Sequence, residues 1–189
     1  MKNSNRKAEL RSAALDYLLA HGVANVSLRP MAAALGTSAR ILMFHFQSKE
    51  GLIGEVLEEL HARLQASFVK VAVDPGRDAP LMRFWKWATS RKNLPYLRLL
   101  YEAQIVAAQN QAEYGRYLKK TSADWQALAF QALSKSLRSE EMATLCVAVF
   151  DGLLLELMVT GEERRLRRAL ERFLAMAKVG GSGKLQSAI

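Results

Sequence analysis

The sequence predicts an all-α protein of about nine helices, with a three-helix helix-turn-helix head at the N-terminus and a larger helical body behind it. Hydrophobic residues recur at three- and four-residue spacing through most of the 189-residue chain, which is the period of an amphipathic helix. Proline, which interrupts helices, occurs only four times. Half of the residues are hydrophobic, so the chain can build a substantial core, and its composition argues against global disorder.

The first predicted helix runs from about Arg6 to Ala20. Its apolar residues fall on one stripe, and polar residues such as Asp16 fall outside it. His21 and Gly22 end the helix. The stripe consists of Leu10, Ala13, Ala14, Tyr17 and Leu18.

Two short helices about a tight turn are predicted between Ser27 and Phe46. Ser27 can cap the first of them, and Pro30 is tolerated in its first turn, where backbone N–H groups lack helical partners. Gly36 allows the sharp turn, and Ser38 can cap the second short helix. The expected apolar face of the first is Met31, Ala34 and Leu35. This pattern is typical of a helix-turn-helix, whose second helix enters the DNA major groove.

The body begins with a long helix over about residues 48–70, which Ser48 can cap. Proline and glycine break the chain between Val73 and Pro80. The buried stripe of the long helix is expected to be Leu52, Val56, Leu60, Leu64 and Phe68. Further helices are predicted over 81–91, 95–109, 111–137, 140–160 and 162–177.

We expect three functional regions. Residues 1–50 form the helix-turn-helix domain, and residues 51–178 form the helical body, with the helix over 48–70 connecting the two. Residues 179–189 form a flexible tail, because the glycine-rich run at its start favours disorder.

The charge pattern favours a polyanionic partner. The formal net charge is +9, and residues 1–50 hold seven Lys or Arg against three Asp or Glu, a net +4. The single cysteine, Cys146, excludes an internal disulfide and fits a reducing cytoplasm. It stands in an apolar run, so we expect a buried and inert thiol.

Residues 142–159 are apolar enough to raise the question of a membrane span. Asp151 and Glu156 lie inside this stretch, and a charge at mid-bilayer costs about 2.5–3.5 kcal/mol. We therefore predict a buried or interface helix and no membrane partner. The basic N-terminus lacks the apolar run of a signal peptide, so a cytoplasmic location is expected.

The stretch from Leu42 to Leu52 reads Leu-Met-Phe-His-Phe-Gln-Ser-Lys-Glu-Gly-Leu. It is similar to the Leu-Tyr-Tyr-His-Phe-x-Ser-Lys-Glu-x-Leu signature of TetR-family transcriptional regulators. Further motifs upstream resemble that family's first helix, second helix and turn, in the family's order, so the resemblance covers roughly residues 5–60. Three positions depart from it: Met43 and Phe44 stand where Tyr is frequent, and Thr37 where Val is common.

The resemblance implies a homodimer that reads a pseudo-palindromic operator in double-stranded DNA with its third helix. On that helix Arg40 can bond to guanine O6 and N7, and Met43 with Phe44 can contact thymine methyl groups. The competing interpretation is that this apolar pair packs on the body. The predicted DNA-binding residues are Arg29, Ser38, Ala39, Arg40, Met43, Phe44, His45, Ser48 and Lys49. Lys2, Arg6 and Lys7 form either a DNA-contacting arm or a solvated one.

The resemblance also implies a small-molecule pocket in the body and a dimer interface in the last two helices. Pocket residues are expected to be Trp85, Tyr101, Glu102, Gln104, Trp125 and Phe150, around a partly apolar effector, although aromatic residues at helical spacing are more often core. Interface residues are expected to be Leu145, Val149, Leu153, Leu157 and Phe173. Repression relieved by the effector is the commoner role in the family.

Two other functions stay open. A helical-bundle metalloenzyme would need two Glu-x-x-His motifs, and only Glu58-x-x-His61 occurs, so we expect no catalytic residue, metal or cofactor. A helix-turn-helix fold that has lost DNA binding would survive as a ligand or partner module, and the unusual Met43–Phe44 pair keeps this alternative open.

Overall fold

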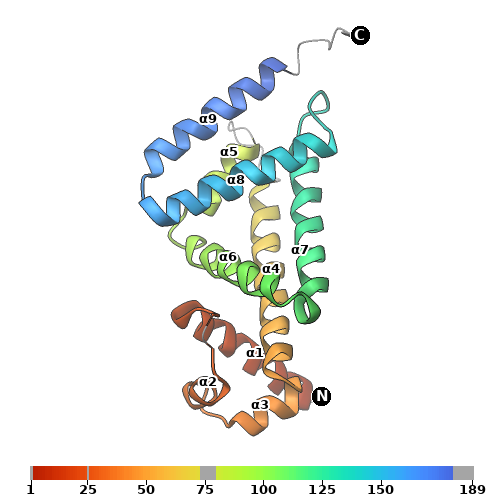
Figure 1. The fold of residues 1–189 in the computed structure, drawn as a ribbon, viewed down its shortest axis with the longest axis vertical. Helices are drawn as coiled ribbons and strands as arrows, with labels where there is room; N and C mark the ends of the chain where they lie inside the picture. The colour runs from red at the N-terminus through yellow and green to blue at the C-terminus, as the bar shows by residue number, and fades with distance from the viewer. Residues whose placement is uncertain (1, 25, 73–79, 181–189) are drawn as a thin grey trace. The chain divides into compact units, whose positions relative to one another are not determined.

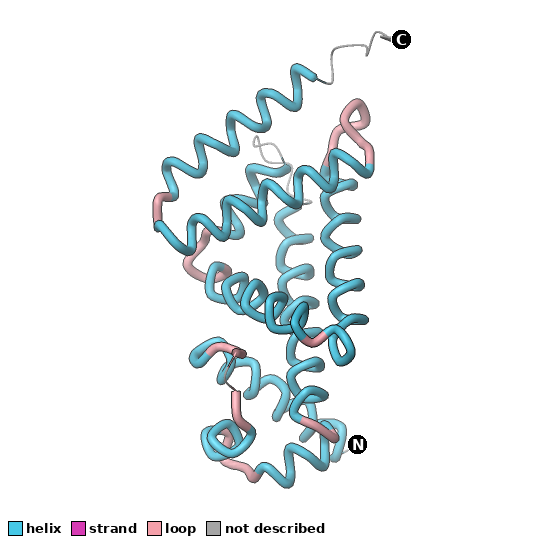
Figure 2. Tube along the Cα trace, viewed as in Figure 1, coloured by secondary structure: helices cyan, strands magenta, loops and turns pink. Residues whose placement is uncertain are grey.

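A computed structural model describes residues 2–24, 26–72 and 80–180, and every regular element in these residues is a helix (Figures 1 and 2). The predicted all-α class is therefore confirmed. The helices are α1 (Lys2–His21), α2 (Leu28–Ala34), α3 (Ala39–Phe46), α4 (Lys49–Ala72), α5 (Pro80–Ala88), α6 (Leu94–Gln109), α7 (Gln111–Ala132), α8 (Glu140–Thr160) and α9 (Glu163–Gly180).

The packing divides the chain into two compact units. The first unit is Met1–Val69 with Ser90–Thr121, and it holds α1 to α3, α6 and the N-terminal parts of α4 and α7. The second unit is Lys70–Thr89 with Ser122–Ile189, and it holds α5, α8, α9 and the rest of α7. The expected functional division near residue 50 stays a prediction.

The head of the first unit packs α2 against both α1 and α3. The side chain of Ser38 caps α3 as predicted, because its Oγ accepts a hydrogen bond from the Ile41 N–H at 3.3 Å. Ser27 occupies the N-cap of α2, but its side chain makes no capping hydrogen bond. The head core is Leu10, Ala14, Leu15, Leu18, Met31, Ala32, Leu42 and Phe46, so Ala32 rather than the exposed Ala34 supports Met31.

The junction between α3 and α4 is held by backbone and hydroxyl groups. Ser48 Oγ accepts a hydrogen bond from the Gly51 N–H at 2.8 Å and so caps α4, as predicted. A Cβ on Gly51 would collide with the carbonyl oxygen of Phe46, so the close approach of these two segments requires glycine. The predicted stripe of α4, from Leu52 to Phe68, is fully buried.

The second unit has its own core. Helix α9 packs against both α8 and α5, and Leu133, Ala143 and Cys146 form a buried cluster. Burial raises the pKa of the Cys146 thiol, which suits an inert core cysteine. The half-buried Phe173 packs on this cluster too.

Several helix ends differ from the prediction, α7 most clearly. It stops at Ala132, five residues early, because the Arg138 guanidinium donates hydrogen bonds to the carbonyl oxygens of Leu133 at 3.0 Å and Gln131 at 3.4 Å. These bonds satisfy carbonyl groups in the last turn of the helix and directly after it. Helix α1 begins at Lys2, α5 ends at Ala88 and α9 reaches Gly180. The expected loop over 73–79 and tail over 181–189 lie outside the described residues.

Among the described helices, α8 alone is long and apolar enough to cross a membrane. Core helices of proteins that never meet a membrane satisfy the same two criteria. Glu156 of α8 pairs with Arg165 of α9 at 2.7 Å, and Asp151 is exposed. The charges that argued against a span are therefore present on the helix surface.

Candidate nucleic-acid interface

Helix α3 carries an apolar outer face. Phe44 is 72% exposed, Ile41 43% and Met43 41%, whereas Leu42 and Phe46 of the same helix are buried. The predicted separation of Met43 and Phe44 from Leu42 and Phe46 is therefore what the structure has. An apolar side chain as exposed as Phe44 is not packed on the rest of its unit, and this apolar surface is available to a partner.

The sequence analysis missed Ile41 on this face. A helical wheel could have found it, because Ile41 and Phe44 are three residues apart and so are neighbours on the helix surface. Ala39 is half-buried at the start of the helix. The hydroxyl of Ser38 is already occupied by its cap bond to the Ile41 N–H.

Two arginines of the head have guanidinium groups that are available for binding. Arg40 is exposed on α3, and Arg29 is exposed in the first turn of α2. Neither forms an ion pair or hydrogen bond with any residue in the part of the chain that the structure describes. A free guanidinium group can bind base edges or phosphate.

The start of α4 offers a second positively charged position at which an anion such as a phosphate group can bind. Lys49 is the first residue of the helix and is half-buried, and its side chain has no acidic partner among the described residues. The positive end of the helix dipole lies at the same place. The ring of His45 is half-buried and meets the Phe44 ring edge-on at 5.2 Å.

The basic N-terminal residues belong to α1 and do not form a separate arm. Lys7 Nζ pairs with Glu55 at 2.6 Å and lies over the Phe46 ring, with its nitrogen 5.2 Å from the ring centroid. Arg6 pairs with Glu9 at 3.1 Å. The side chain of Lys2 lies outside the described residues.

An ion-pair network fixes α1 against α4. Arg11 Nε lies 2.5 Å from a Glu59 carboxylate oxygen, and Arg63 bonds to the other oxygen. Burial opposes the ionisation of Glu59, but the hydrogen bonds and charges of the two arginines outweigh it and lower the pKa of this carboxyl. The network orients the helix that leads into the head.

The residues predicted to line the effector pocket are divided between the two units. In the second unit, Phe84 contacts Trp125 and Phe150, with ring centroids 5.9 and 4.9 Å apart, and Trp85 contacts Phe150 at 6.5 Å. We call these four residues the aromatic cluster. The indole N–H of the fully buried Trp85 has no acceptor within the described parts of the chain. An unsatisfied buried donor of this kind is a sign of a missing partner.

The other three candidates lie on α6 in the first unit. Tyr101 and Gln104 are half-buried there. The Glu102 carboxylate accepts hydrogen bonds from the backbone N–H groups of Val23 at 2.8 Å and Ala24 at 3.0 Å. Glu102 therefore has a structural task that its predicted role as a pocket residue did not include.

The expected interface residues have unequal exposure. Leu145 is exposed, and Val149 and Leu153 are half-buried, but Leu157 is only 7% exposed and belongs to the core. Spacing of three and four residues instead defines an exposed stripe on α8, which we call the α8 stripe. It consists of Leu145, Ala148, Gly152, Leu155 and Val159.

Within the described residues, no three His, Cys, Asp or Glu side chains lie close enough together to hold a metal ion. Glu58 and His61 of the single Glu-x-x-His motif lie on α4.

Residues 10–56 match the family of bacterial regulatory proteins named after TetR. No curated protein sequence matches the chain. A transcriptional regulator from Rhodococcus sp. Rha1 shares the fold, with 21% identity, a TM-score of 0.77, and coverage of 92% of this chain and 96% of that one. A candidate transcriptional regulator from Pseudomonas aeruginosa PAO1 has 23% identity and a TM-score of 0.76, with coverage of 95% of this chain and 93% of that one. The multidrug binding protein EbrR complexed with ethidium has 24% identity and a TM-score of 0.63, with coverage of 88% of this chain and 97% of that one.

The helix-turn-helix head and the all-helical fold are shared with solved structures of transcriptional regulators. The match over the head is specific to one family of such regulators. Residues 10–56 thus resemble the DNA-binding domain of the TetR family, and the chain as a whole shares the fold of a solved TetR-family regulator.

Proposed function

We propose that this protein is a homodimeric repressor that binds a pseudo-palindromic operator and leaves it when a small-molecule effector binds. The observation that carries the proposal is the outer face of α3, where Met43 and Phe44 are exposed beside Arg40, which has no partner in the described structure. This combination suits a major groove, since the guanidinium can bond to guanine and the apolar groups can contact thymine methyls.

Phosphate contacts would set the register on the operator. Lys49 at the start of α4 and Arg29 at the start of α2 are the strongest candidates, because each is unpaired among the described residues and stands at a helix N-terminus. Ser38 and Ser48 would contribute less, because their side-chain oxygens already accept capping hydrogen bonds. Ala39 and His45 would flank the contact.

The α8 stripe is the proposed centre of the dimer interface. Val159 is 75% exposed and Leu155 51%, so the stripe presents apolar surface that a second copy would bury. Ala148 and Gly152 lie between the larger side chains and would allow the partner helix to approach closely. Leu153 and Val149 would lie at the edge of this surface.

The aromatic cluster is the proposed effector site. Its apolar rings suit a flat or partly apolar molecule, and the buried indole N–H of Trp85 would donate to an acceptor on it. EbrR, which shares the fold, binds ethidium and proflavin, and this supports an effector of similar aromatic character. Tyr101 and Gln104 belong to the first unit and are not part of this proposed site. The proposed role places the protein in the cytoplasm and requires no enzymatic activity.

Selection from a random duplex pool tests the proposal. The purified chain should enrich a two-fold symmetric sequence with half-sites about one helical turn apart. Failure to enrich any sequence, with a folded protein that still binds an aromatic ligand, would favour the alternative of a ligand module without DNA binding.

A further inference from the structure

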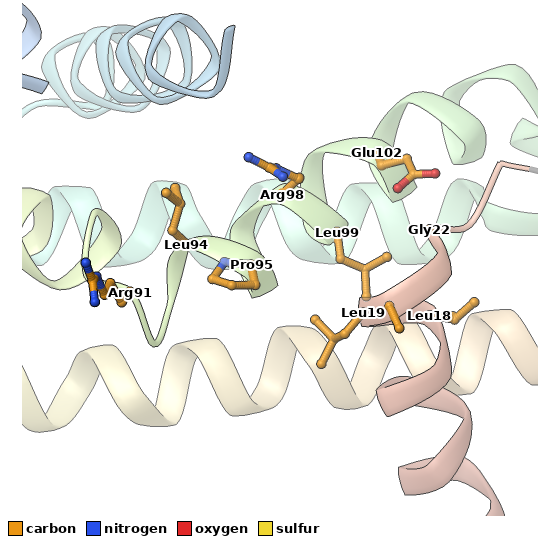
Figure 3. Close-up of a pocket in the computed structure, with 10 residues that line it drawn as sticks. Leu18, Leu19, Gly22, Arg91, Leu94, Pro95, Arg98, Leu99 and Glu102 are labelled. Atoms are coloured by element: carbon orange, nitrogen blue, oxygen red, sulfur yellow. The ribbon is translucent and has the colours of Figure 1, made fainter. Parts of the chain in front are cut away.

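The first unit contains a cavity that the proposed function does not use. It has a volume of about 450 Å³ and lies between the C-terminal end of α1 and the N-terminal half of α6 (Figure 3). A volume of this size falls in the range of small-molecule sites. The effector site proposed above is built on the aromatic cluster, and the cavity shares none of those four residues.

One side of the cavity carries excess positive charge. Arg91 precedes α6 by one turn and Arg98 lies on its second turn, so the two are seven residues apart and line the same cavity (Figure 3). Both are exposed, and neither has an acidic partner among the residues that the structure describes. The positive end of the α6 dipole lies between them, at Leu94.

The one carboxylate among the lining residues does not neutralise this charge. Glu102 accepts the N–H groups of Val23 and Ala24, and no ion pair joins it to Arg98. The cavity therefore offers two unpaired guanidinium groups, each of which can bind a carboxylate in bidentate geometry.

The rest of the lining is apolar. Leu18 and Leu99 are buried, and Leu19 and Leu94 are half-buried, so the lining includes leucines of both α1 and α6 (Figure 3). A hydrocarbon chain would be transferred from water onto these leucines, which is favourable in proportion to the area buried. The cavity thus combines a cationic side with an apolar body.

We infer that this cavity binds an amphipathic carboxylate, with the carboxylate on the cationic side that carries Arg91 and Arg98 and the hydrocarbon against the leucines. The site is additional to the effector pocket, and its occupation requires neither DNA nor the aromatic cluster. Charge complementarity selects an anion, and the leucines select a chain over a small inorganic ion.

Calorimetric titration of the full-length protein with decanoate tests the inference. Decanol and inorganic phosphate serve as probes that lack the carboxylate and the chain, respectively. Decanoate should bind at least tenfold more tightly than either. Arg98→Gln and Arg91→Gln should each weaken decanoate at least fivefold and leave decanol within twofold. Leu94→Ala should weaken decanoate and decanol together.

Arg116→Gln is the matched control, because Arg116 is an exposed arginine of the same unit that lies outside the cavity and has no described partner. It should leave decanoate binding unchanged. Equal loss in Arg116→Gln and Arg98→Gln would show a nonspecific charge effect and would overturn the site. Decanoate affinity that survives Arg91→Gln/Arg98→Gln but falls in Phe84→Ala would place the ligand in the aromatic cluster and overturn it as well.

Discussion

Glu102 ties α6 to the segment that joins α1 and α2, and Glu102→Ala should destabilise the head. The substitution removes the acceptor of two backbone donors, the N–H groups of Val23 at 2.8 Å and Ala24 at 3.0 Å. Val23 is 2% exposed, so its N–H would remain buried without a partner, whereas the exposed Ala24 can turn to water. An unsatisfied buried donor costs about 1–3 kcal/mol.

We expect a loss of about 2 kcal/mol in the free energy of unfolding, because water competes for the half-exposed carboxylate. For a chain of this size about 1 kcal/mol corresponds to roughly 2–4 °C, so the midpoint should fall by about 4–8 °C. Differential scanning calorimetry measures the midpoint, and circular dichroism checks that the helix content is kept.

Two variants make this test specific. Glu102→Gln keeps one acceptor oxygen and should lose less than half as much stability. Glu113→Ala, at an exposed carboxylate of the same unit with no hydrogen bond or ion pair to a described residue, should change the midpoint little. Equal midpoints for Glu102→Ala and Glu113→Ala would refute the structural role of Glu102.

Four further predictions concern packing, assembly and pH. Gly51→Ala should destabilise by about 2 kcal/mol because its Cβ collides with a carbonyl, whereas Gly54→Ala, which has room, should stabilise by up to about 1 kcal/mol in urea unfolding. Leu155→Glu should convert dimers to monomers in sedimentation velocity. The pKa of Glu59 is lowered from its ordinary value of 4.5, so ionised Glu59 stabilises the fold at pH values above 4.5, and this stability is lost as the pH falls below 4.5. Glu59→Gln should therefore lose less stability than the unsubstituted protein over that fall in pH. Trp85→Phe should cost less than about 2 kcal/mol in urea unfolding, because loss of an unsatisfied donor offsets part of the cost of the cavity left by the smaller ring.

Each of these four predictions has a result that would contradict it. A stabilising Gly51→Ala would mean that the α3–α4 junction relaxes freely. Ile105→Glu is the control for assembly, since Ile105 is 59% exposed on α6, outside the α8 stripe; monomers from both variants would dismiss the stripe as the interface. If the stability of Glu59→Gln falls with decreasing pH as steeply as that of the unsubstituted protein, the ion pairs of Glu59 do not contribute to the stability of the fold. A loss of more than about 2 kcal/mol in Trp85→Phe would show that its N–H has a partner.

The sequence predicted the head well because its signals are local. Ser38 and Ser48 are capping residues at the starts of α3 and α4, and each makes the predicted type of bond. The stripe of α4 follows from periodicity alone, and all five residues are buried.

What the sequence could not predict depends on contacts between distant segments. Arg138 ends α7 by reaching back to carbonyl groups five and seven residues earlier, and a Lys or Gln there would look similar in the sequence. Glu102 bonds to backbone groups 78 and 79 residues away, which no spacing rule shows. On α8, apolar residues occur on every side, so periodicity could not separate the buried Leu157 from the exposed Leu155.

The outer face of α3 is proposed to read DNA sequence. Titration of Arg40→Ala against the selected operator and a scrambled duplex, at one fixed salt concentration, tests it most directly. Arg116→Ala serves as the matched control. Arg40→Ala should cost about 1–3 kcal/mol on the operator, roughly a 5- to 150-fold loss, and much less on the scrambled duplex. Equal losses on the two duplexes, in a folded protein, would make Arg40 a phosphate contact and contradict the claim.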